Sequence, residues 1–205
     1  MDNKNKSIRI FISILFVCLL IGGVFLFLYQ KNRYSDVFFE YNGFAVQRAL
    51  DKGVEEFRIE IFINNGEQPF VIRSRYSPKD LEGIEVSGSI KENIIKKKLY
   101  ITMDPSLSSL ATIAFAEIDK FTENPFLFNL PTFPGLTSNV NDSNLPVINC
   151  NNVSESVGVI KFIVEDENKI YDEGGCVILE SANEKELIKV ADRLSLTLLG
   201  VMNSR

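Results

Sequence analysis

The stretch VGVIKFIVEDENKIYDEGGCVILE, residues 157–180, decides the fold of this chain. Two runs rich in valine and isoleucine stand on either side of the acidic sequence EDEN, a pattern typical of strands joined by a hairpin turn. The apolar period then changes from that of a strand to that of a helix. The predicted helical face consists of Leu187, Val190, Ala191, Leu194, Leu198 and Val201. Strands followed by an amphipathic helix predict an α+β fold.

Polar residues mark the start of this C-terminal helix. Ser181 or Asn183 fits the N-cap position, and a glutamate follows three positions after each, as a capping box requires. Asp192 and Arg193 are adjacent within the helix, so their side chains diverge around its axis. We therefore expect a structural or solvated role for this charged pair.

Two earlier segments repeat the plan of strands followed by a helix start. In the first, Asn65-Gly66 is the dipeptide that a tight hairpin favours. Ser77 then fits a cap, with Pro78 in the first helical position. The predicted strands of this segment are 41–48, 55–63 and 70–76.

The second segment predicts a strand at 97–103 and a helix that begins at Asp104 and Pro105. The apolar face of this helix consists of Leu107, Leu110, Ala111, Ala114, Ile118 and Phe121. Together, the three segments predict one α+β domain over residues 37–205, with a mixed or antiparallel sheet and helices packed on it.

Residues 122–149 predict a long loop, because four prolines and six asparagines interrupt any regular period. Loops of this length in a compact domain are commonly functional or disordered. The apolar side chains of the loop either pack back onto the domain or dock on a partner or the membrane surface. This candidate interaction surface consists of Phe126, Phe128, Leu130, Phe133 and Leu136.

Near the N-terminus, residues 10–29 contain no charged side chain. Twenty residues in a helix span roughly 30 Å, the thickness of the hydrocarbon core of a bilayer. The run is longer than the apolar part of a cleaved signal peptide, and Cys18 follows a valine and not the small residue that a lipoprotein requires. We therefore expect an uncleaved transmembrane anchor.

The orientation of this anchor follows from the basic residues around it. Three basic residues precede the span and two follow it, which favours a cytoplasmic N-terminus by a narrow margin. The prediction is a cytoplasmic segment 1–9, the span 10–29, a short tether 30–36 and an extracytoplasmic domain.

Cys150 and Cys176 are the only cysteines outside the predicted span. Two cysteines without any histidine suit a disulfide better than a metal site or a catalytic thiol. The alternatives are two buried free cysteines or a reactive thiol, although the acidic residues near both positions would raise a thiol pKa. Asn141 and Asn152 begin glycosylation sequons on either side of Cys150, and both features are typical of proteins outside the cytosol.

The composition excludes several classes of function. The absence of histidine removes serine triads, cysteine–histidine dyads and histidine-bearing zinc sites. A net charge of −5 argues against a nucleic-acid partner. No phosphate-binding loop, dinucleotide fingerprint or calcium loop is present in the sequence, so we expect no cofactor.

These observations favour a membrane-tethered, extracytoplasmic binding or structural domain that is not an enzyme and has an envelope protein as its partner. Two alternatives stay open: a subunit of a larger membrane complex, and an envelope enzyme that uses carboxylates alone. A deep polar cleft with two acids of shifted pKa would favour the enzyme.

The sequence resembles a family of uncharacterised archaeal membrane-anchored proteins. The resemblance is carried by INCNN at 148–152, GGCVIL at 174–179 and ELIKVADRLSLTLLGVM at 186–202, with weaker matches in YNGF at 41–44 and YITMDP at 100–105. It implies a single anchor, a paired Cys150 and Cys176, and an archaeal membrane setting. It implies no activity and no functional residues.

Overall fold

The structure, a computed structural model, describes residues 15, 18–25, 38–63, 66–141 and 143–204. The chain divides into two compact units, Met1–Val37 and Phe38–Arg205. In the first unit, Leu15 and residues 18–25 are helical and exposed. Within the described ranges, no helix has both the length and the apolar character needed to cross a membrane. The predicted segments 1–9 and 30–36, with most of the predicted span 10–29, lie outside the described residues.

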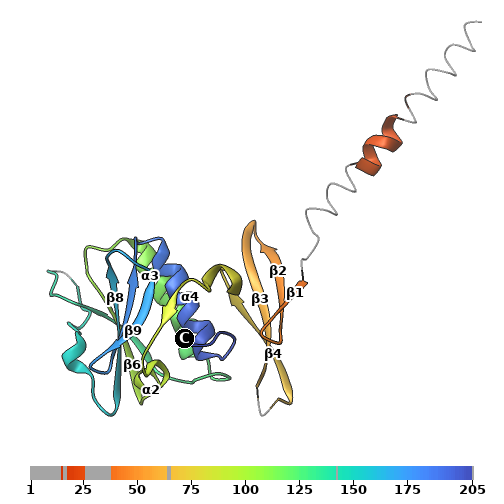
Figure 1. The fold of residues 1–205 in the computed structure, drawn as a ribbon. Helices are drawn as coiled ribbons and strands as arrows, with labels where there is room; N and C mark the ends of the chain where they lie inside the picture. Colours follow the sequence, from red (N-terminus) through yellow and green to blue (C-terminus); the bar gives the residue numbers. More distant parts are fainter. Residues whose placement is uncertain (1–14, 16–17, 26–37, 64–65, 142, 205) are drawn as a thin grey trace, which may run out of the picture. The chain divides into compact units, whose positions relative to one another are not determined.

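The first sheet of the second unit, drawn in orange in Figure 1, is an antiparallel meander. Its strands are β1 (Phe38–Tyr41), β2 (Phe44–Asp51), β3 (Val54–Ile63) and β4 (Gln68–Ser74). Val46, Ile59 and Ile72 are register partners across β2, β3 and β4, and all three are buried. The predicted hairpin is present, since Ile63 pairs with Gln68 across the turn.

The second sheet has six strands in the order β5-β9-β10-β8-β6-β7. β6, β7, β8 and β10 run parallel, whereas β9 is antiparallel to β10 and β5 is parallel to β9. The bounds are β5 (Glu85–Val86), β6 (Lys98–Met103), β7 (Thr132–Leu136), β8 (Val157–Val164), β9 (Lys169–Glu173) and β10 (Cys176–Ser181).

The α+β class is therefore confirmed, but the prediction of one sheet is wrong. The strands of the first segment pair only with their neighbours in sequence, because turns of two residues join β1 to β2 and β2 to β3. Such local pairing completes a sheet without the later strands. The first sheet is antiparallel and the second is mixed.

The predicted hairpin within 157–180 is also wrong in its pairing. β10 lies between β8 and β9, so the chain passes to the far side of β10 before it turns back. The tight turn is at Gly174 and Gly175, which both have positive φ and join β9 to β10. All six residues of β10 are buried, as expected for a central strand with neighbours on both edges.

The helices are α2 (Ile90–Ile94), α3 (Ser109–Thr122) and α4 (Glu186–Leu198), with short 3-10 turns η1 (Pro78–Leu81) and η2 (Cys150–Asn152). Ser77 caps η1 as predicted, because its side chain accepts a hydrogen bond from the backbone N–H of Lys79. The predicted start of α3 at Asp104 is wrong. Asp104 closes a turn by accepting hydrogen bonds from Ser106, and the N-cap of the helix is Ser108.

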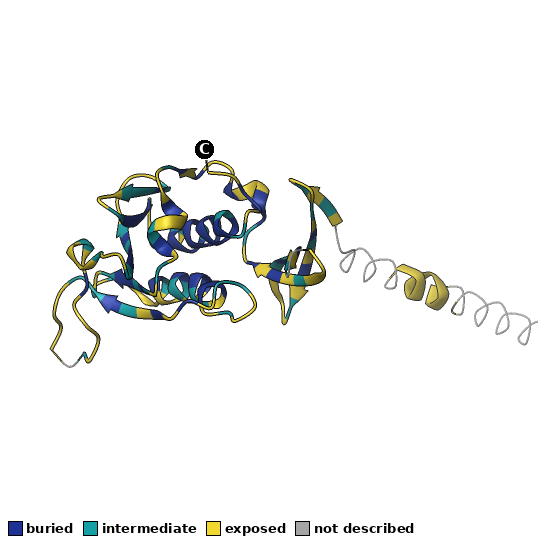
Figure 2. Cartoon of the chain, turned by 90° about the horizontal axis from the view of Figure 1, so that it is seen from below, coloured by how far each residue is buried: buried dark blue, intermediate teal, exposed yellow. Residues whose placement is uncertain are grey.

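The two faces of the six-stranded sheet carry separate clusters of buried side chains. Ile160, Val177 and Leu179 lie on the face that packs against α3 and α4. Figure 2 shows buried residues concentrated on these helices and strands. The predicted apolar face of this helix is confirmed over the length of α4, where Leu187, Val190, Ala191, Leu194 and Leu198 are all buried. Val201 is buried too, but it lies after the end of the helix. The second cluster consists of Ile148, Val159, Cys176 and Ile178.

The prediction of a loop throughout 122–149 is wrong at Thr132–Leu136, which forms β7. Pro134 hid this strand in the sequence, because a proline cannot donate to a ladder and is tolerated only on an edge. Backbone N–H groups on the edge of β7 that faces away from β6 already have hydrogen-bond partners. The N–H of Thr132 donates to Glu123, and the N–H of Leu136 donates to the carbonyl of Pro146.

Candidate functional site

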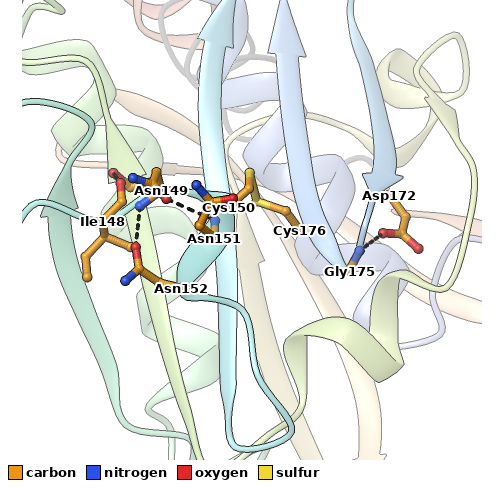
Figure 3. Close-up of a disulfide and its surroundings, with 9 residues drawn as sticks. Ile148, Asn149, Cys150, Asn151, Asn152, Asp172, Gly175 and Cys176 are labelled. Atoms are coloured by element: carbon orange, nitrogen blue, oxygen red, sulfur yellow. Dashed lines mark hydrogen bonds between the residues drawn. A yellow bond between two sulfur atoms is a disulfide. The ribbon is translucent and has the colours of Figure 1, made fainter.

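A disulfide joins Cys150 to Cys176, with 5.3 Å between the two Cα atoms (Figure 3). Cys176 is fully buried at the start of β10, and Cys150 begins η2. The bridge therefore fastens the connection between β7 and β8 to the sheet face opposite α3 and α4. The predicted pairing is confirmed, and neither free thiols nor a reactive thiol describes these two residues.

The asparagines around the bridge hold η2 in a fixed conformation. The side chain of Asn149 accepts from the N–H of Asn151, and the side chain of Asn152 accepts from the N–H of Asn149 at 2.8 Å. Figure 3 shows both hydrogen bonds beside the disulfide. Asn141 and Asn152, the two sequon asparagines, are both exposed, but the amide oxygen of Asn152 is already engaged. Glycosylation of either residue stays a prediction.

The predicted apolar surface does not form one continuous patch. Leu130 is buried, and Phe128 and Leu136 are half-buried. Phe126 is 62% exposed and its ring lies 6.2 Å from that of Phe70. Phe133 is 44% exposed and contacts a different strand, since its ring lies 5.6 Å from that of Tyr100 on β6. Most of this segment packs back onto the domain, which was one of the two alternatives.

Asp192 lies at the centre of a buried polar cluster that the sequence did not reveal. One carboxylate oxygen accepts from the hydroxyl of Ser74 and from the N–H groups of Arg75 and Tyr76, at 2.8, 2.8 and 3.0 Å. The other oxygen is buried and has no hydrogen-bond partner among the described residues. Burial raises the pKa of Asp192 to about 7, although the nearby charge of Lys120 acts in the opposite direction.

Glu117 of α3 is the second acid of this cluster. It is 5% exposed and forms ion pairs with Arg75 and Lys120. The hydrogen bond to Glu117 is the main cause that raises the pKa of Arg75. Because Asp192 is only 1% exposed, solvent and substrate do not reach its carboxylate. The cluster fastens the end of β4 to α3 and α4, so the structural role expected for Asp192 fits this geometry.

A pocket of about 370 Å³ lies where β6, β7 and β8 end. We call it the carboxyl-edge pocket. Its polar residues are Asp104 and Ser106 after β6, Thr137 after β7 and Lys161 on β8. The Ser106 hydroxyl and N–H donate to Asp104, which lowers the pKa of this exposed carboxyl. The sequence could not reveal this site, because its residues come together only through the strand order.

The loops at this edge are connected to each other. Ser108, the cap of α3, donates through its N–H and its hydroxyl to the carboxylate of Glu184, which precedes α4. This contact joins the loop after β6 to the loop after β10. Ser108 directly follows Leu107, which lines the carboxyl-edge pocket.

Two other pockets lie elsewhere in the domain. One of about 450 Å³ lies between residues 88–92 and 197–204, beside the five-residue helix α2. Another, of about 500 Å³, lies on β1 and β2 and is formed mainly by Phe38, Phe39 and Glu40. Across the part of the chain that the structure describes, no three cysteine, aspartate or glutamate side chains gather as metal ligands would.

No protein-family model matches this chain, and no match was found among the curated proteins or the solved structures.

Proposed function

We propose that the chain is a membrane-tethered domain outside the cytosol that binds another component of the cell envelope and performs no catalysis. The disulfide between Cys150 and Cys176 is the observation that carries this proposal. Disulfides persist in oxidising compartments and are rare in the cytosol, where thiols are kept reduced. A bridge buried at the start of a central strand is a structural feature and not a transient one.

The tether is the uncharged run 10–29, which we propose crosses the membrane. Its described residues are helical, and the large apolar side chains among them are exposed. These exposed side chains are Leu15, Leu19, Leu20, Ile21, Val24 and Phe25. An apolar surface of this kind is favourable in lipid and costly in water. The resemblance to archaeal membrane-anchored proteins is consistent with such a tether.

The length of the linking segment supports a domain close to the membrane. Residues 30–36 reach at most about 25 Å when fully extended. A domain on so short a tether would meet partners that also lie at the membrane surface. We propose an envelope protein as such a partner, with Phe126 and Phe133 as exposed aromatic contacts.

A binding role is better supported than catalysis by carboxylates. Asp192 and Glu117 are the pair of acids that most resembles a catalytic pair of carboxylates. Both are buried and contact the segment 74–76. A general acid must reach the substrate within hydrogen-bond distance. Neither acid lines the pockets described above.

A non-reducing peptide map of the full chain, extracted from native membranes with free thiols blocked, tests the compartment. We expect Cys150 and Cys176 in one linked peptide pair, with Cys18 alkylated as a free thiol. Cys18 is the internal control, because it is the free cysteine of the structure. Alkylated Cys150 and Cys176 in freshly blocked samples would contradict a domain outside the cytosol.

A further inference from the structure

The strand order opens a crevice at the carboxyl ends of β6 and β8. These strands are parallel neighbours. The chain leaves β6 through α3 towards β7 on one side, and leaves β8 towards β9 on the other side. Ligands of open α/β sheets bind at such points, where the connections of two adjacent strands diverge. The carboxyl-edge pocket lies at this point of the sheet.

Opposite charges line the carboxyl-edge pocket without neutralising each other. The side chain of Lys161 has no hydrogen bond or ion pair with any described residue. Asp104 uses one carboxylate oxygen for Ser106, and its lowered pKa keeps the group ionised. No ion pair within 4.0 Å joins Asp104 to Lys161 in the described part of the chain. Both groups are therefore available to a ligand.

The apolar residues of the carboxyl-edge pocket and the acidic residues near it restrict which ligands fit. Leu107, Ile163 and Val164 supply apolar surface between the polar groups. The exposed acidic residues 165–167 follow directly after β8, whose last residue, Val164, lines the pocket. Acidic neighbours disfavour a simple anion, and the unpaired Lys161 disfavours a simple cation.

We propose that the carboxyl-edge pocket binds a small zwitterion of the α-amino-acid class, with Lys161 on its carboxylate, Asp104 on its ammonium group and Leu107 against its side chain. Ser106 and Thr137 supply hydroxyls beside the charged groups. This ligand is additional to the envelope protein proposed above, because the carboxyl-edge pocket contains neither Phe126 nor Phe133. The proposal therefore goes beyond the proposed function and does not depend on the membrane tether.

Calorimetric titration of the full chain in detergent micelles with L-leucine tests this site. We expect saturable binding that weakens at least tenfold in Lys161→Met and in Asp104→Asn. Asn at position 104 keeps an oxygen that accepts from Ser106, so the turn after β6 is retained. Two analogues separate the charges: N-acetyl-L-leucine lacks the ammonium group, and L-leucinamide lacks the carboxylate. Binding of N-acetyl-L-leucine should respond to Lys161→Met but not to Asp104→Asn, and L-leucinamide should show the reverse.

Matched controls make the same charge changes outside the pocket. Lys97→Met and Asp166→Asn alter exposed residues, and we expect both to bind L-leucine within twofold of the unaltered chain. Absence of saturable L-leucine binding would overturn the proposal, as would equal weakening by the controls. Either failure would leave the cysteine map unchanged, so it would be distinguishable from a failure of the proposed compartment.

Discussion

Asp192 connects residues that lie 116 positions apart in the sequence, through its hydrogen bond with the N–H of Tyr76. A carboxylate that is buried with one unpartnered oxygen is costly when ionised, because it loses its hydration. Protonation removes most of this cost. The proton therefore stabilises the folded state at this residue.

The sign of the pH dependence follows from the raised pKa of about 7, against 3.8 for an ordinary aspartate. Between these values the folded chain binds more protons than the unfolded chain, so the free energy of unfolding falls as pH rises towards 7. We expect Asp192→Asn to abolish this contribution, which is on the order of a few kcal/mol. Urea unfolding of both chains between pH 5 and pH 8 measures it.

Asp119 also has a raised pKa, of about 6, caused by burial and by Glu123. Asp119→Asn is therefore the matched control, and it should remove a smaller part of the same slope. A difference in stability between the unaltered chain and Asp192→Asn that is constant from pH 5 to pH 8 would refute the effect assigned to Asp192.

At the residue scale, the features that the sequence predicted correctly are those that depend on local pattern. The buried face of α4 and the cap at Ser77 follow from spacing and residue type. The cysteine pair was favoured over free thiols by the cysteine count and the absence of histidine. The partners of Asp192 do not, because Ser74 and Tyr76 lie 118 and 116 positions away in the sequence and meet it only in the tertiary structure. Local pattern contains no information on such distant contacts.

At the scale of elements, Gly158 permits the close approach of β8 to the end of α2. A Cβ atom at this position would lie 2.8 Å from the carbonyl oxygen of Asn93 and 2.9 Å from that of Ile94. We expect Gly158→Ala to destabilise the fold by about 1–3 kcal/mol, because backbone atoms must shift. Gly83→Ala is the control, since no atom lies within 4 Å of its added Cβ. Equal unfolding midpoints for the two variants would show that β8 and α2 are not in close contact.

The disulfide acts on the connection between β7 and β8, an element without regular structure over much of its length. Removing the bridge by Cys176→Ser should lower the free energy of unfolding by on the order of 3 kcal/mol. We also expect limited proteolysis to cut near 137–149 faster than in the unaltered chain. Cys18→Ser, which removes the free cysteine, should change neither rate nor stability. Unchanged proteolysis of Cys176→Ser would mean that other contacts hold this connection.

Element types were easier to predict from the sequence than element order. The alternation in β3 and the apolar face of α3 identify a strand and a helix, and both are present. The insertion of β10 between β8 and β9 was missed, because a hairpin and a crossover share the same local pattern of apolar residues and turn. β7 was missed because Pro134 is allowed only at an edge, and the edge is a property of the whole sheet.

At the scale of the whole molecule, the chain combines an apolar N-terminal run with a disulfide-bonded domain that begins at Phe38. The two features have one explanation if the run crosses the membrane and the domain lies outside the cytosol. The carboxyl-edge pocket would then face small molecules of the cell exterior.

Labelling of an introduced surface cysteine in intact cells tests this topology most directly. Glu67 is exposed, so a membrane-impermeant maleimide should label Glu67→Cys in the full chain without lysis. Asn5→Cys, on the predicted cytoplasmic side, should be labelled only after lysis. Labelling of Glu67→Cys that requires lysis, with Asn5→Cys labelled in intact cells, would contradict the account.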